Sequence, residues 1–598
     1  MKRLLSGNEA IALGAYESGT AVAAAYPGTP STEILEHVAK YPGVYAEWTP
    51  NEKVALDVAV GAAYAGKRAL AAMKHVGLNV AADSLFYASY TGVVGGLVIV
   101  TADDPGMYSS QNEQDNRNYA KFAKLPMLEP SDSQEARDFV KLAFALSEEF
   151  ATPVLLRTTT RVAHSYSVVD VPQGEAALPL ASTDKLPYPR DQTRYVMIPG
   201  NAQRRHPIVE ERLVKLAEYA ETFVGNRVEA GDRECGIISG GIAYQYAREV
   251  FPEASFLKLG MSYPLPRRLI QDFAGQVEKV IVLEDLDPFW EEQVRLLGVA
   301  CEGKRYFPMI GEFNPDVVRA GAVKAGLLPA SEAAEAGATG FQPVAFPLPG
   351  RPPVLCPGCG HRGVLYVLKK LKVVINGDIG CYTLGVISPL SAMDSCGCMG
   401  ASIGVAHGVE RAGAQERAVA VIGDSTFFHS GIAPLINVFY NQGTAVTFIL
   451  DNQTTAMTGH QDHPGTGKTL QNVEPVKVDL EKLVRGIGIE DVYVVDAYDL
   501  KAVEQAARAA LAGKRPAVVI ARRPCALMVK AKGPELVVNA ERCNGCALCL
   551  RTGCPALIRV SEKLVRIDPL LCTGCAVCQQ VCARGAILVA SWAARVVR

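Results

Sequence analysis

Two cysteine runs in the last part of this 598-residue chain constrain its fold more than any other sequence feature. The first run has the spacing C-x2-C-x2-C-x4-C, and the second has C-x2-C-x2-C-x3-C. Thiolates at this spacing are typical of iron–sulfur ligation. A zinc ribbon is the alternative. The eight cysteines are Cys543, Cys546, Cys549 and Cys554 in the first run, and Cys572, Cys575, Cys578 and Cys582 in the second.

Both runs resemble the cluster-binding repeats of two-cluster ferredoxins, in which the fourth cysteine of each run binds the other cluster. The resemblance implies a ferredoxin-like α+β domain over residues 534–598 with two 4Fe-4S clusters. The first run has one extra residue before Cys554, and the second has Ala583 in place of the usual proline. The implied ligand sets are Cys543, Cys546, Cys549 and Cys582 for one cluster, and Cys572, Cys575, Cys578 and Cys554 for the other.

The composition favours a cytoplasmic protein with reduced thiols. The chain has sixteen cysteines, and its first residues contain no apolar stretch of signal-peptide length. Because cytosolic thiols are kept reduced, these cysteines indicate metal ligation rather than disulfides. A net charge of −2 provides no field that would attract nucleic acid or an anionic membrane. A hydrophobic content of 49% with 20% charged residues indicates globular domains, and the length suggests about four of them.

A metal clamp is predicted where two short apolar runs end. Both runs, residues 418–422 and 445–450, are typical of parallel strands, which are buried on both faces. In open α/β sheets the ligand lies beyond the carboxyl ends of such strands. The carboxylate of Asp424 and the amide of Asn452 would meet there, and oxygen ligands of this kind suit Mg²⁺ bound to a diphosphate. The alternative is ordinary turn chemistry after each strand.

The sequence Gly423-Asp424-Ser425, with Asn452 at position 28 after Asp424, resembles the thiamine diphosphate fingerprint. The resemblance implies that Asp424 and Asn452 ligate Mg²⁺ through their side chains and that Thr454 does so through its carbonyl oxygen. Ser425 replaces the glycine usual in the fingerprint, and an aspartate replaces its first asparagine, but neither change removes an implied ligand. Gly423 lets the backbone come close to the cofactor.

Alternating strand and helix patterns over residues 1–165 predict a doubly wound α/β domain. Its segment Tyr-Pro-Gly-Thr-Pro-Ser-Thr-Glu, which begins at Tyr26, and the Ala- and Gly-rich helix at Glu52 resemble the pyrimidine-binding domain of 2-oxoacid:ferredoxin oxidoreductases. The resemblance implies that Glu52 shares a proton with the pyrimidine N1′ of thiamine diphosphate and that Thr29 contacts the substrate. A partly desolvated carboxyl suits this role. The alternative is that Glu52 only stabilises the helix dipole as an acidic first-turn residue.

Two further domains are expected along the chain. Residues 193–328 resemble the transketolase C-terminal domain, whose role in the family is largely structural, and residues 350–533 resemble the diphosphate-binding domain. The segments 161–192 and 329–353, rich in Pro, Ala, Gly or polar residues, are expected linkers. The expected fold is therefore a multidomain α/β protein with two doubly wound thiamine diphosphate-binding domains, a transketolase-like domain and a ferredoxin-like tail.

A third cysteine set begins before the clamp and continues after it. A C-x2-C pair beside His361 could be a redox dithiol, half of a zinc site or part of an iron–sulfur site. In 2-oxoacid:ferredoxin oxidoreductases a similar pair with two later cysteines holds a 4Fe-4S cluster close to the thiamine. The alternative is that the thiols are structural or simply reduced. The residues that would hold this third cluster by resemblance are Cys356, Cys359, Cys381 and Cys525.

Three basic residues are candidates for contact with a substrate. His460 and His463 lie in the loop after the clamp, and neutral histidines there could donate a proton or polarise a carbonyl group. A loop imidazole without a role is the alternative. Arg117 is a candidate for binding a substrate carboxylate.

The order of these motifs over nearly the whole chain most resembles the large subunits of indolepyruvate:ferredoxin oxidoreductases. The resemblance implies that an arylpyruvate (indolepyruvate, phenylpyruvate or hydroxyphenylpyruvate) is decarboxylated on thiamine diphosphate, that electrons pass through the clusters to ferredoxin, and that coenzyme A receives the acyl group. It also implies a smaller beta subunit as partner, in a dimer of heterodimers. The rivals are an oxidoreductase for another 2-oxoacid, a non-oxidative thiamine decarboxylase, and an electron-transfer subunit without catalysis of its own.

Overall fold

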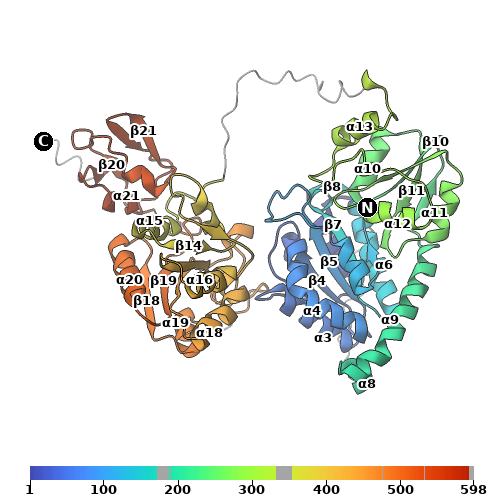
Figure 1. Cartoon of the computed structure of the whole chain (residues 1–598), viewed down its shortest axis with the longest axis horizontal. Coiled ribbons are helices and arrows are strands. Elements are labelled where there is room, and N and C mark those ends of the chain that lie inside the picture. Colours follow the sequence, from blue (N-terminus) through green and yellow to red (C-terminus); the bar gives the residue numbers. More distant parts are fainter. Residues whose placement is uncertain (172–187, 189, 332–352, 475, 531, 591–598) are drawn as a thin grey trace. The chain divides into compact units, whose positions relative to one another are not determined.

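The chain divides into two compact units, Met1–Pro347 (unit 1) and Leu348–Arg598 (unit 2). The computed structural model describes residues 1–171, 188, 190–331, 353–474, 476–530 and 532–590 (Figure 1). None of the helices among these residues combines the length and the apolar character that a membrane span requires.

A seven-stranded sheet lies at the centre of unit 1. Its neighbouring strands pair in parallel, apart from one antiparallel pair at the edge. The three middle strands are buried at every position, as expected for a parallel sheet covered by helices. In spatial order the strands are β12 (Met261–Tyr263), β6 (Met127–Leu128), β7 (Val154–Thr159), β5 (Leu97–Asp103), β4 (Ala69–Lys74), β2 (Val22–Ala25) and β3 (Tyr45–Trp48).

Helices pack on both faces of this sheet (Figure 1). On one face, Leu56, Leu78 and Ala120 from three helices join Ile99 of β5 in one apolar cluster. The other face is covered by two helices that pack against each other. The first group is α3 (Glu52–Tyr64), α4 (His75–Thr91) and α5 (Arg117–Ala123), the second is α1 (Gly7–Glu17) and α6 (Ser133–Glu149), and the short α2 (Thr32–Val38) follows β2.

Residues expected to form a linker extend this first layer instead. The helix α7 (Thr160–His164) and the strand β8 (Tyr166–Asp170) follow β7 directly, and β8 pairs antiparallel with β1 (Lys2–Ser6), beyond the expected boundary at residue 165. Only Val169 of β8 is buried, so the pairing rests on backbone hydrogen bonds that composition does not reveal. The remainder of this expected linker, 172–187 and 189, and residues 332–352 of the second lie outside the described residues.

A four-stranded sheet forms the second layer of unit 1. Its spatial order is β13 (Lys279–Leu283), β10 (Asp232–Gly240), β11 (Ala254–Leu259) and β9 (Arg227–Glu229), of which β9 alone is antiparallel. Four helices pack on it, α10 (Gly241–Val250), α11 (Arg267–Ala274), α12 (Phe289–Leu296) and α13 (Pro315–Lys324).

The two layers of unit 1 are not independent. Strand β12 joins the first sheet although it follows β11 in the chain. The helix α9 (Pro199–Ala220), which follows α8 (Gln192–Tyr195), packs on α4, where Arg212 donates a 2.7 Å hydrogen bond to the carbonyl of Ser89. Residues 193–328 therefore belong to the same compact unit as the first layer.

Unit 2 is built on a six-stranded sheet in which all neighbouring strands are parallel. Its spatial order is β15 (Ser395–Cys396), β14 (Val374–Gly377), β16 (Ala418–Gly423), β17 (Val446–Asp451), β19 (Ala517–Arg522) and β18 (Asp491–Asp496). The two apolar runs of the predicted clamp are thus adjacent, buried, central strands. This confirms the predicted α/β fold class with parallel sheets.

Helices cover the unit 2 sheet on two sides. One apolar cluster joins the sheet to α15 (His361–Leu371) and α20 (Leu500–Ala512), and another joins it to α16 (Ala401–Arg411), α18 (Ile432–Tyr440) and α19 (Leu480–Ile487). Short helical turns complete the layer: η2 (Cys381–Val386), α17 (Asp424–Thr426), η3 (Phe427–Gly431) and η4 (Ala456–Thr458).

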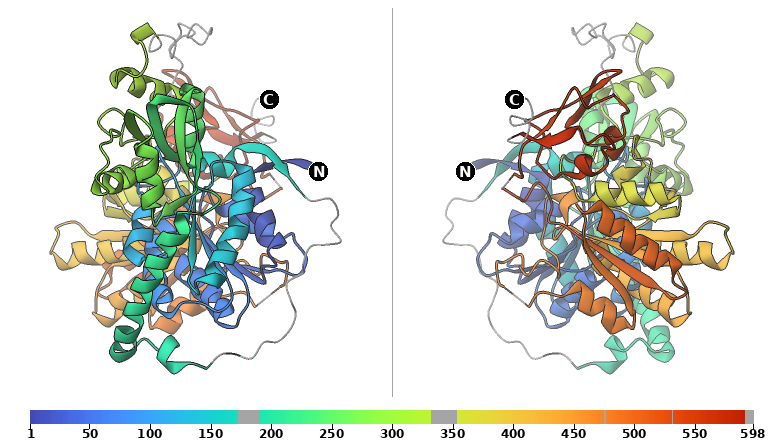
Figure 2. Two further views of the ribbon diagram at one scale, coloured as in Figure 1. Left: turned by 90° about the vertical axis from the view of Figure 1, so that its right-hand side faces the viewer. Right: turned by 90° about the vertical axis from the view of Figure 1, so that its left-hand side faces the viewer.

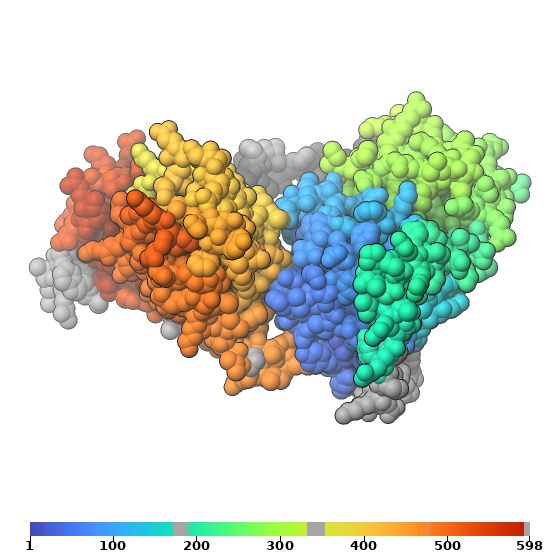
Figure 3. All heavy atoms as spheres, turned by 60° about the horizontal axis from the view of Figure 1, so that its bottom comes forward, coloured from blue at the N-terminus to red at the C-terminus, as the bar shows by residue number. Residues whose placement is uncertain are grey.

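The C-terminal tail packs on unit 2 next to α15 (Figure 1), and its red segments adjoin the yellow and orange segments of that unit in Figures 2 and 3. It consists of two antiparallel pairs, β20 (Leu536–Val538) with β23 (Ile587–Val589) and β21 (Leu557–Ser561) with β22 (Leu564–Ile567), and two short helices, η5 (Cys549–Thr552) and α21 (Val577–Gln580). Val577 belongs to the apolar cluster that contains Leu365, and the side chain of Gln580 accepts a 3.0 Å hydrogen bond from the amide of Leu500.

Candidate functional site

The carboxyl ends of β16 and β17 bring the predicted metal ligands together in unit 2. Gly423 is in register with Leu450, so Asp424 and Asn452 lie at the same edge of the sheet. A Cβ atom on Gly423 would lie 2.8 Å from a ring carbon of Tyr382, and the turn therefore requires glycine.

Hydrogen bonds fix the buried carboxylate of Asp424. One oxygen accepts the amide of Ser425 at 3.0 Å, and the other accepts the amide of Gln453 at 2.7 Å and contacts Nε2 of His463 at 3.2 Å. His463 is itself buried, and its Nδ1 accepts the amide of Gly465 at 3.1 Å. His463 is therefore a positioning residue for Asp424 in this structure.

The other residues of the clamp bond mainly within their own loop. The side-chain oxygen of Asn452 accepts the amide of Thr454 at 3.3 Å, and the hydroxyl of Thr454 donates to the carbonyl of Gln461 at 3.4 Å. The hydroxyls of Ser425 and Thr455 lie 2.8 Å apart and join the two loops. The arrangement presents one carboxylate and one amide at a sheet edge, which is a donor set suited to Mg²⁺.

A pocket beside this clamp is lined by cysteines from three parts of the sequence. Burial raises the pKa of Cys359 to about 12 and that of Cys381 to about 11. Asn452, His361 and His460 share the lining, so the pocket reaches the clamp. The four cysteines of the lining are Cys356, Cys359, Cys381 and Cys525.

These thiols line a cavity, which is the arrangement that the ligands of a 4Fe-4S cluster would need. A 4Fe-4S cluster places each thiolate on a different iron, so its ligands surround a cavity, whereas a zinc ion draws its ligands to one point. No group of three or more His, Cys, Asp or Glu side chains in the described ranges converges on a single-ion site. All sixteen cysteines lie within these ranges and none is in a disulfide.

The two loop histidines have different neighbours. His460 has a positive φ of 69°, and its Nε2 lies 3.6 Å from the sulfur of Cys525. His463 contacts Asp424 instead. The two histidines of this loop therefore contact different groups, and the role of His460 in proton transfer stays a prediction.

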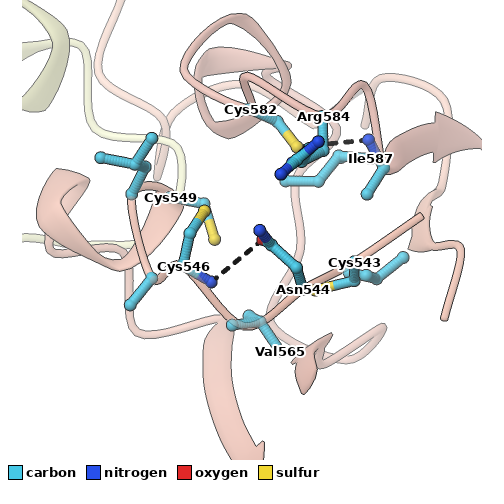
Figure 4. A pocket seen from close by; sticks show the side chains of 12 residues that line it. Cys543, Asn544, Cys546, Cys549, Val565, Cys582, Arg584 and Ile587 are labelled. Carbon is cyan, nitrogen blue, oxygen red and sulfur yellow. Dashed lines mark hydrogen bonds between the residues drawn. The ribbon is translucent and has the colours of Figure 1, made fainter. Parts of the chain in front are cut away.

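The tail brings its first predicted ligand set into one pocket (Figure 4). Cys546 is exposed, and its amide donates to the side chain of Asn544 at 3.3 Å. The sulfur of Cys582 accepts the amide of Ala586 at 3.2 Å. The cysteines that line this pocket are Cys543, Cys546, Cys549 and Cys582.

The second predicted set also gathers in the tail. Burial raises the pKa of Cys578 far above its ordinary value, and four neighbouring thiols raise it further: Cys575, Cys554 and Cys572 of the same set, and Cys549 of the other. The sulfur of Cys572 accepts the amide of Gly574 at 3.4 Å. The fourth cysteine of each run thus lies with the first three of the other.

The predicted proton-relay residue of unit 1, Glu52, is the first residue of α3. Asn51 caps this helix by accepting the amide of Val54 at 3.0 Å, and Glu52 itself is buried. A Cβ atom on Gly77 would lie 2.6 Å from a carboxylate oxygen of Glu52, so α4 makes room for the acid with a glycine. Thr29 lies nearby in the sequence in a partly exposed turn and precedes a cis proline.

Lys74 is a buried cation near Glu52 that the sequence analysis did not single out. It ends β4 and is buried, and its ammonium donates a 2.5 Å hydrogen bond to the carbonyl of Ser109. Burial lowers its pKa to about 8, and the carboxylates of Asp104 and Glu52 oppose that shift. The only sequence signal was a cation at the end of an apolar strand.

The prediction that Arg117 binds a substrate carboxylate is wrong. Its guanidinium is buried, pairs with Asp115 at 2.5 Å and with Glu284 at 2.7 Å, and lies 4.8 Å from the ring centroid of Trp290. Its remaining contacts go to the backbone carbonyls of Asp285 and residue 287. Arg117 therefore connects the two layers of unit 1, and its side chain is buried in this ion-pair network.

Two family models match parts of the chain. Residues 13–223 match the family described as "Pyruvate flavodoxin/ferredoxin oxidoreductase, thiamine diP-bdg", and residues 378–521 match "Thiamine pyrophosphate enzyme, C-terminal TPP binding domain". A solved 2-oxoglutarate:ferredoxin oxidoreductase from Magnetococcus marinus is 18% identical, with a TM-score of 0.45 over 55% of this chain and 65% of that one.

Two relatives match over almost their full length. The indolepyruvate oxidoreductase subunit IorA of Archaeoglobus fulgidus is 45% identical, and the match covers 98% of this chain and 97% of that protein. The same subunit of Methanothermobacter thermautotrophicus is 42% identical over the same shares. The chain accordingly belongs to the indolepyruvate oxidoreductase subunit IorA family and is an oxidoreductase with two thiamine diphosphate-binding α/β domains.

Proposed function

We propose that this chain, with a smaller beta subunit, oxidatively decarboxylates arylpyruvates such as indolepyruvate, phenylpyruvate and hydroxyphenylpyruvate. The products would be an arylacetyl-CoA, CO₂ and reduced ferredoxin. The observation that carries the proposal is the pocket lined by four cysteines and by Asn452, because a cluster held there would lie beside the residues that would hold thiamine diphosphate. A non-oxidative decarboxylase would have no use for such a site. The names of the relatives support indolepyruvate as the substrate.

The residues of unit 2 would hold the diphosphate through Mg²⁺. Asp424 and Asn452 would ligate the ion through side-chain oxygens and Thr454 through its carbonyl, while Gly423 and Ser425 shape the turn that receives the diphosphate. His463 holds the Asp424 carboxylate in one orientation. When bound, thiamine diphosphate supplies the nucleophilic carbon for attack on a 2-oxo group.

Unit 1 would supply the acid and the substrate anchor. Glu52 is buried at a helix N-terminus, where a carboxylate can share a proton with the aminopyrimidine. We assign the substrate carboxylate to Lys74, because it is the buried cation that interacts with Glu52 and lies against the Tyr-Pro-Gly-Thr-Pro turn. A Cβ atom on Gly28 of that turn would lie 3.2 Å from the Cβ of Lys74. Thr29 follows in the same turn.

The three cysteine sets would hold three 4Fe-4S clusters. The parent protein should therefore contain about 12 iron atoms per chain, and about 8 if only the tail clusters form. Cys359→Ala should lower the content from about 12 to about 8. An unchanged iron content in that variant would remove the third cluster.

The decisive experiment is anaerobic purification with the beta subunit, followed by viologen reduction. Indolepyruvate, pyruvate and 2-oxoglutarate are compared with and without coenzyme A, and the acyl-CoA product is identified by mass spectrometry. We expect CoA-dependent reduction with indolepyruvate above the other two acids. A higher rate with 2-oxoglutarate would favour another 2-oxoacid, and CO₂ release without viologen reduction would establish the non-oxidative alternative. An iron-replete heteromer that is inactive with all three acids would overturn the catalytic proposal.

A further inference from the structure

Two cysteine loops of unit 2 touch each other although they lie far apart in the sequence. Gly358, between Cys356 and Cys359, faces Thr573, between Cys572 and Cys575. A Cβ atom on Gly358 would lie 2.2 Å from the hydroxyl of Thr573, and Gly358 has a φ of 71°. The hydroxyl of Tyr498 donates a 2.5 Å hydrogen bond to the carbonyl of Gly358 and helps to hold this loop in place.

One buried arginine bonds to both cysteine regions. Arg362 lies in the first turn of α15, and its Nε donates a 3.0 Å hydrogen bond to the carbonyl of Cys356. Its Nη1 donates to the carbonyls of Gly553 and Thr552, which immediately precede Cys554 in the tail. A single guanidinium therefore connects the backbone next to one ligand of each set.

Within the described residues, Arg362 forms no ion pair with a carboxylate. Its hydrogen bonds go to backbone carbonyls, and its Nη2 is buried without a hydrogen-bond partner. Burial lowers its pKa, and the nearby thiols Cys554, Cys359, Cys356 and Cys575 oppose that shift. A buried cation without a counter-ion is unfavourable. A 4Fe-4S cluster held by four thiolates is an anion, so a cluster on each side would supply the missing charge.

We propose that Arg362 is the shared cation of two neighbouring clusters and raises the reduction potentials of both. The clusters are those on the Cys356 set and the Cys554 set, so the inference rests on the proposed function. Reduction adds negative charge to a cluster, and a fixed positive charge nearby favours the reduced form. An electron passed from one of these clusters to the other would leave the total negative charge beside Arg362 unchanged. The hydrogen bonds of Arg362 within the described residues go to Cys356, Thr552 and Gly553 and to no cysteine of the Cys543 set, so the cluster of that set serves as the internal reference.

The test is a redox titration of the anaerobically purified heteromer, followed by electron paramagnetic resonance. Arg362→Gln removes the charge and Arg362→Lys keeps it. Arg551→Gln is the matched control, because Arg551 is exposed in η5 near the same cysteine run. We expect Arg362→Gln to shift two of the three cluster signals to lower potential at unchanged iron content. The third signal, and all signals of Arg551→Gln, should keep the parent potentials.

The outcomes separate this inference from the proposed function. A parent protein with about 8 iron atoms would show that the Cys356 set holds no cluster, which overturns the shared site before any arginine is changed. Three clusters whose potentials are the same in Arg362→Gln as in the parent would overturn the role of Arg362 alone. Where Arg362→Gln loses iron, Arg362→Lys decides. Reduction potentials of Arg362→Lys equal to those of the parent support the proposal that a positive charge at this position raises the potentials. Equal loss of iron in both variants refutes that proposal.

Discussion

Glu52 and Lys74 are two buried ionisable residues of unit 1. The electrostatic interaction between them opposes the lowering of the pKa of Lys74 that burial causes. The acid sits at a helix N-terminus, where the backbone amides favour its charge. The lysine ends a strand among buried residues and gains only partial compensation from Asp104 and Glu52. Such a cation lowers the stability of the empty protein, as binding sites for anions often do.

Replacing Glu52 tests the cofactor role against a helix-dipole role. We expect Glu52→Gln to abolish viologen reduction at unchanged iron content, because glutamine cannot exchange a proton with the pyrimidine. The control is Asp316→Asn, since Asp316 is an exposed acid in the first turn of α13 and shares only the dipole effect. Normal turnover by Glu52→Gln would refute the catalytic assignment.

Lys74→Met should stabilise the protein while it weakens substrate binding. The pKa of Lys74 falls from 10.5 to about 8 on folding, so at pH 7 the folded state carries a charged lysine that burial disfavours. At about 1.4 kcal/mol per pKa unit, and allowing for the lost bond to Ser109, the gain should be about 1–3 kcal/mol. Thermal unfolding at pH 7 measures it, and KM for indolepyruvate should rise.

The sign of the pH dependence follows from the lowered pKa. Between about pH 8 and pH 10.5 the unfolded parent binds a proton that the folded parent has lost, so the parent gains stability as pH rises. The advantage of Lys74→Met should therefore shrink over that interval. A constant difference between the two proteins across it would show that Lys74 is not buried as a cation.

At the scale of the elements, strands were more predictable than the contacts they make. The runs that became β16 and β17 are apolar at nearly every position, which only a strand buried on both faces requires. The ribbon of β1 and β8 was missed because Val169 is its one buried residue in β8. The two CxxC loops were recognisable as motifs. Their contact, between Gly358 and Thr573, could not be predicted, because more than 200 residues separate the two loops in the sequence.

Gly358→Ala tests the contact between the cysteine loops. The added methyl group would overlap Thr573, and the positive φ disfavours a side chain, so we expect a loss of about 2 kcal/mol and faster loss of iron in air. Gly404→Ala is the control. Nothing lies within 4 Å of a Cβ at Gly404 in α16, and alanine there should stabilise by up to about 1 kcal/mol. Equal melting temperatures for the two variants would contradict the contact.

At the scale of the whole molecule, buried charges connect the layers of unit 1. The arginine proposed from sequence as a substrate anchor is instead paired with acids from both layers, and a lone arginine in a sequence gives no sign of its partners. The cysteine sets were easier to predict from the sequence, because the cysteines of each run lie only a few residues apart. The roles of Lys74 and Arg362 depend on burial and on distant neighbours, which no spacing encodes.

Arg117→Met should destabilise unit 1 by about 3–5 kcal/mol, because Asp115 and Glu284 would remain buried without their counter-ion. Chemical unfolding measures the loss. The control is Arg68→Met, since Arg68 and Glu148 form a half-exposed pair that should contribute about 1 kcal/mol or less. A raised KM with unchanged stability would restore Arg117 as a substrate anchor.

The apolar cluster that joins Val577 of the tail to Leu365 and Ala497 has a consequence for shortened versions of the chain. A chain that stopped before the tail would expose to water the apolar side of α15 that Val577 covers. The tail is therefore part of the folding unit that it packs on, and its removal should lower solubility as well as remove its cysteines.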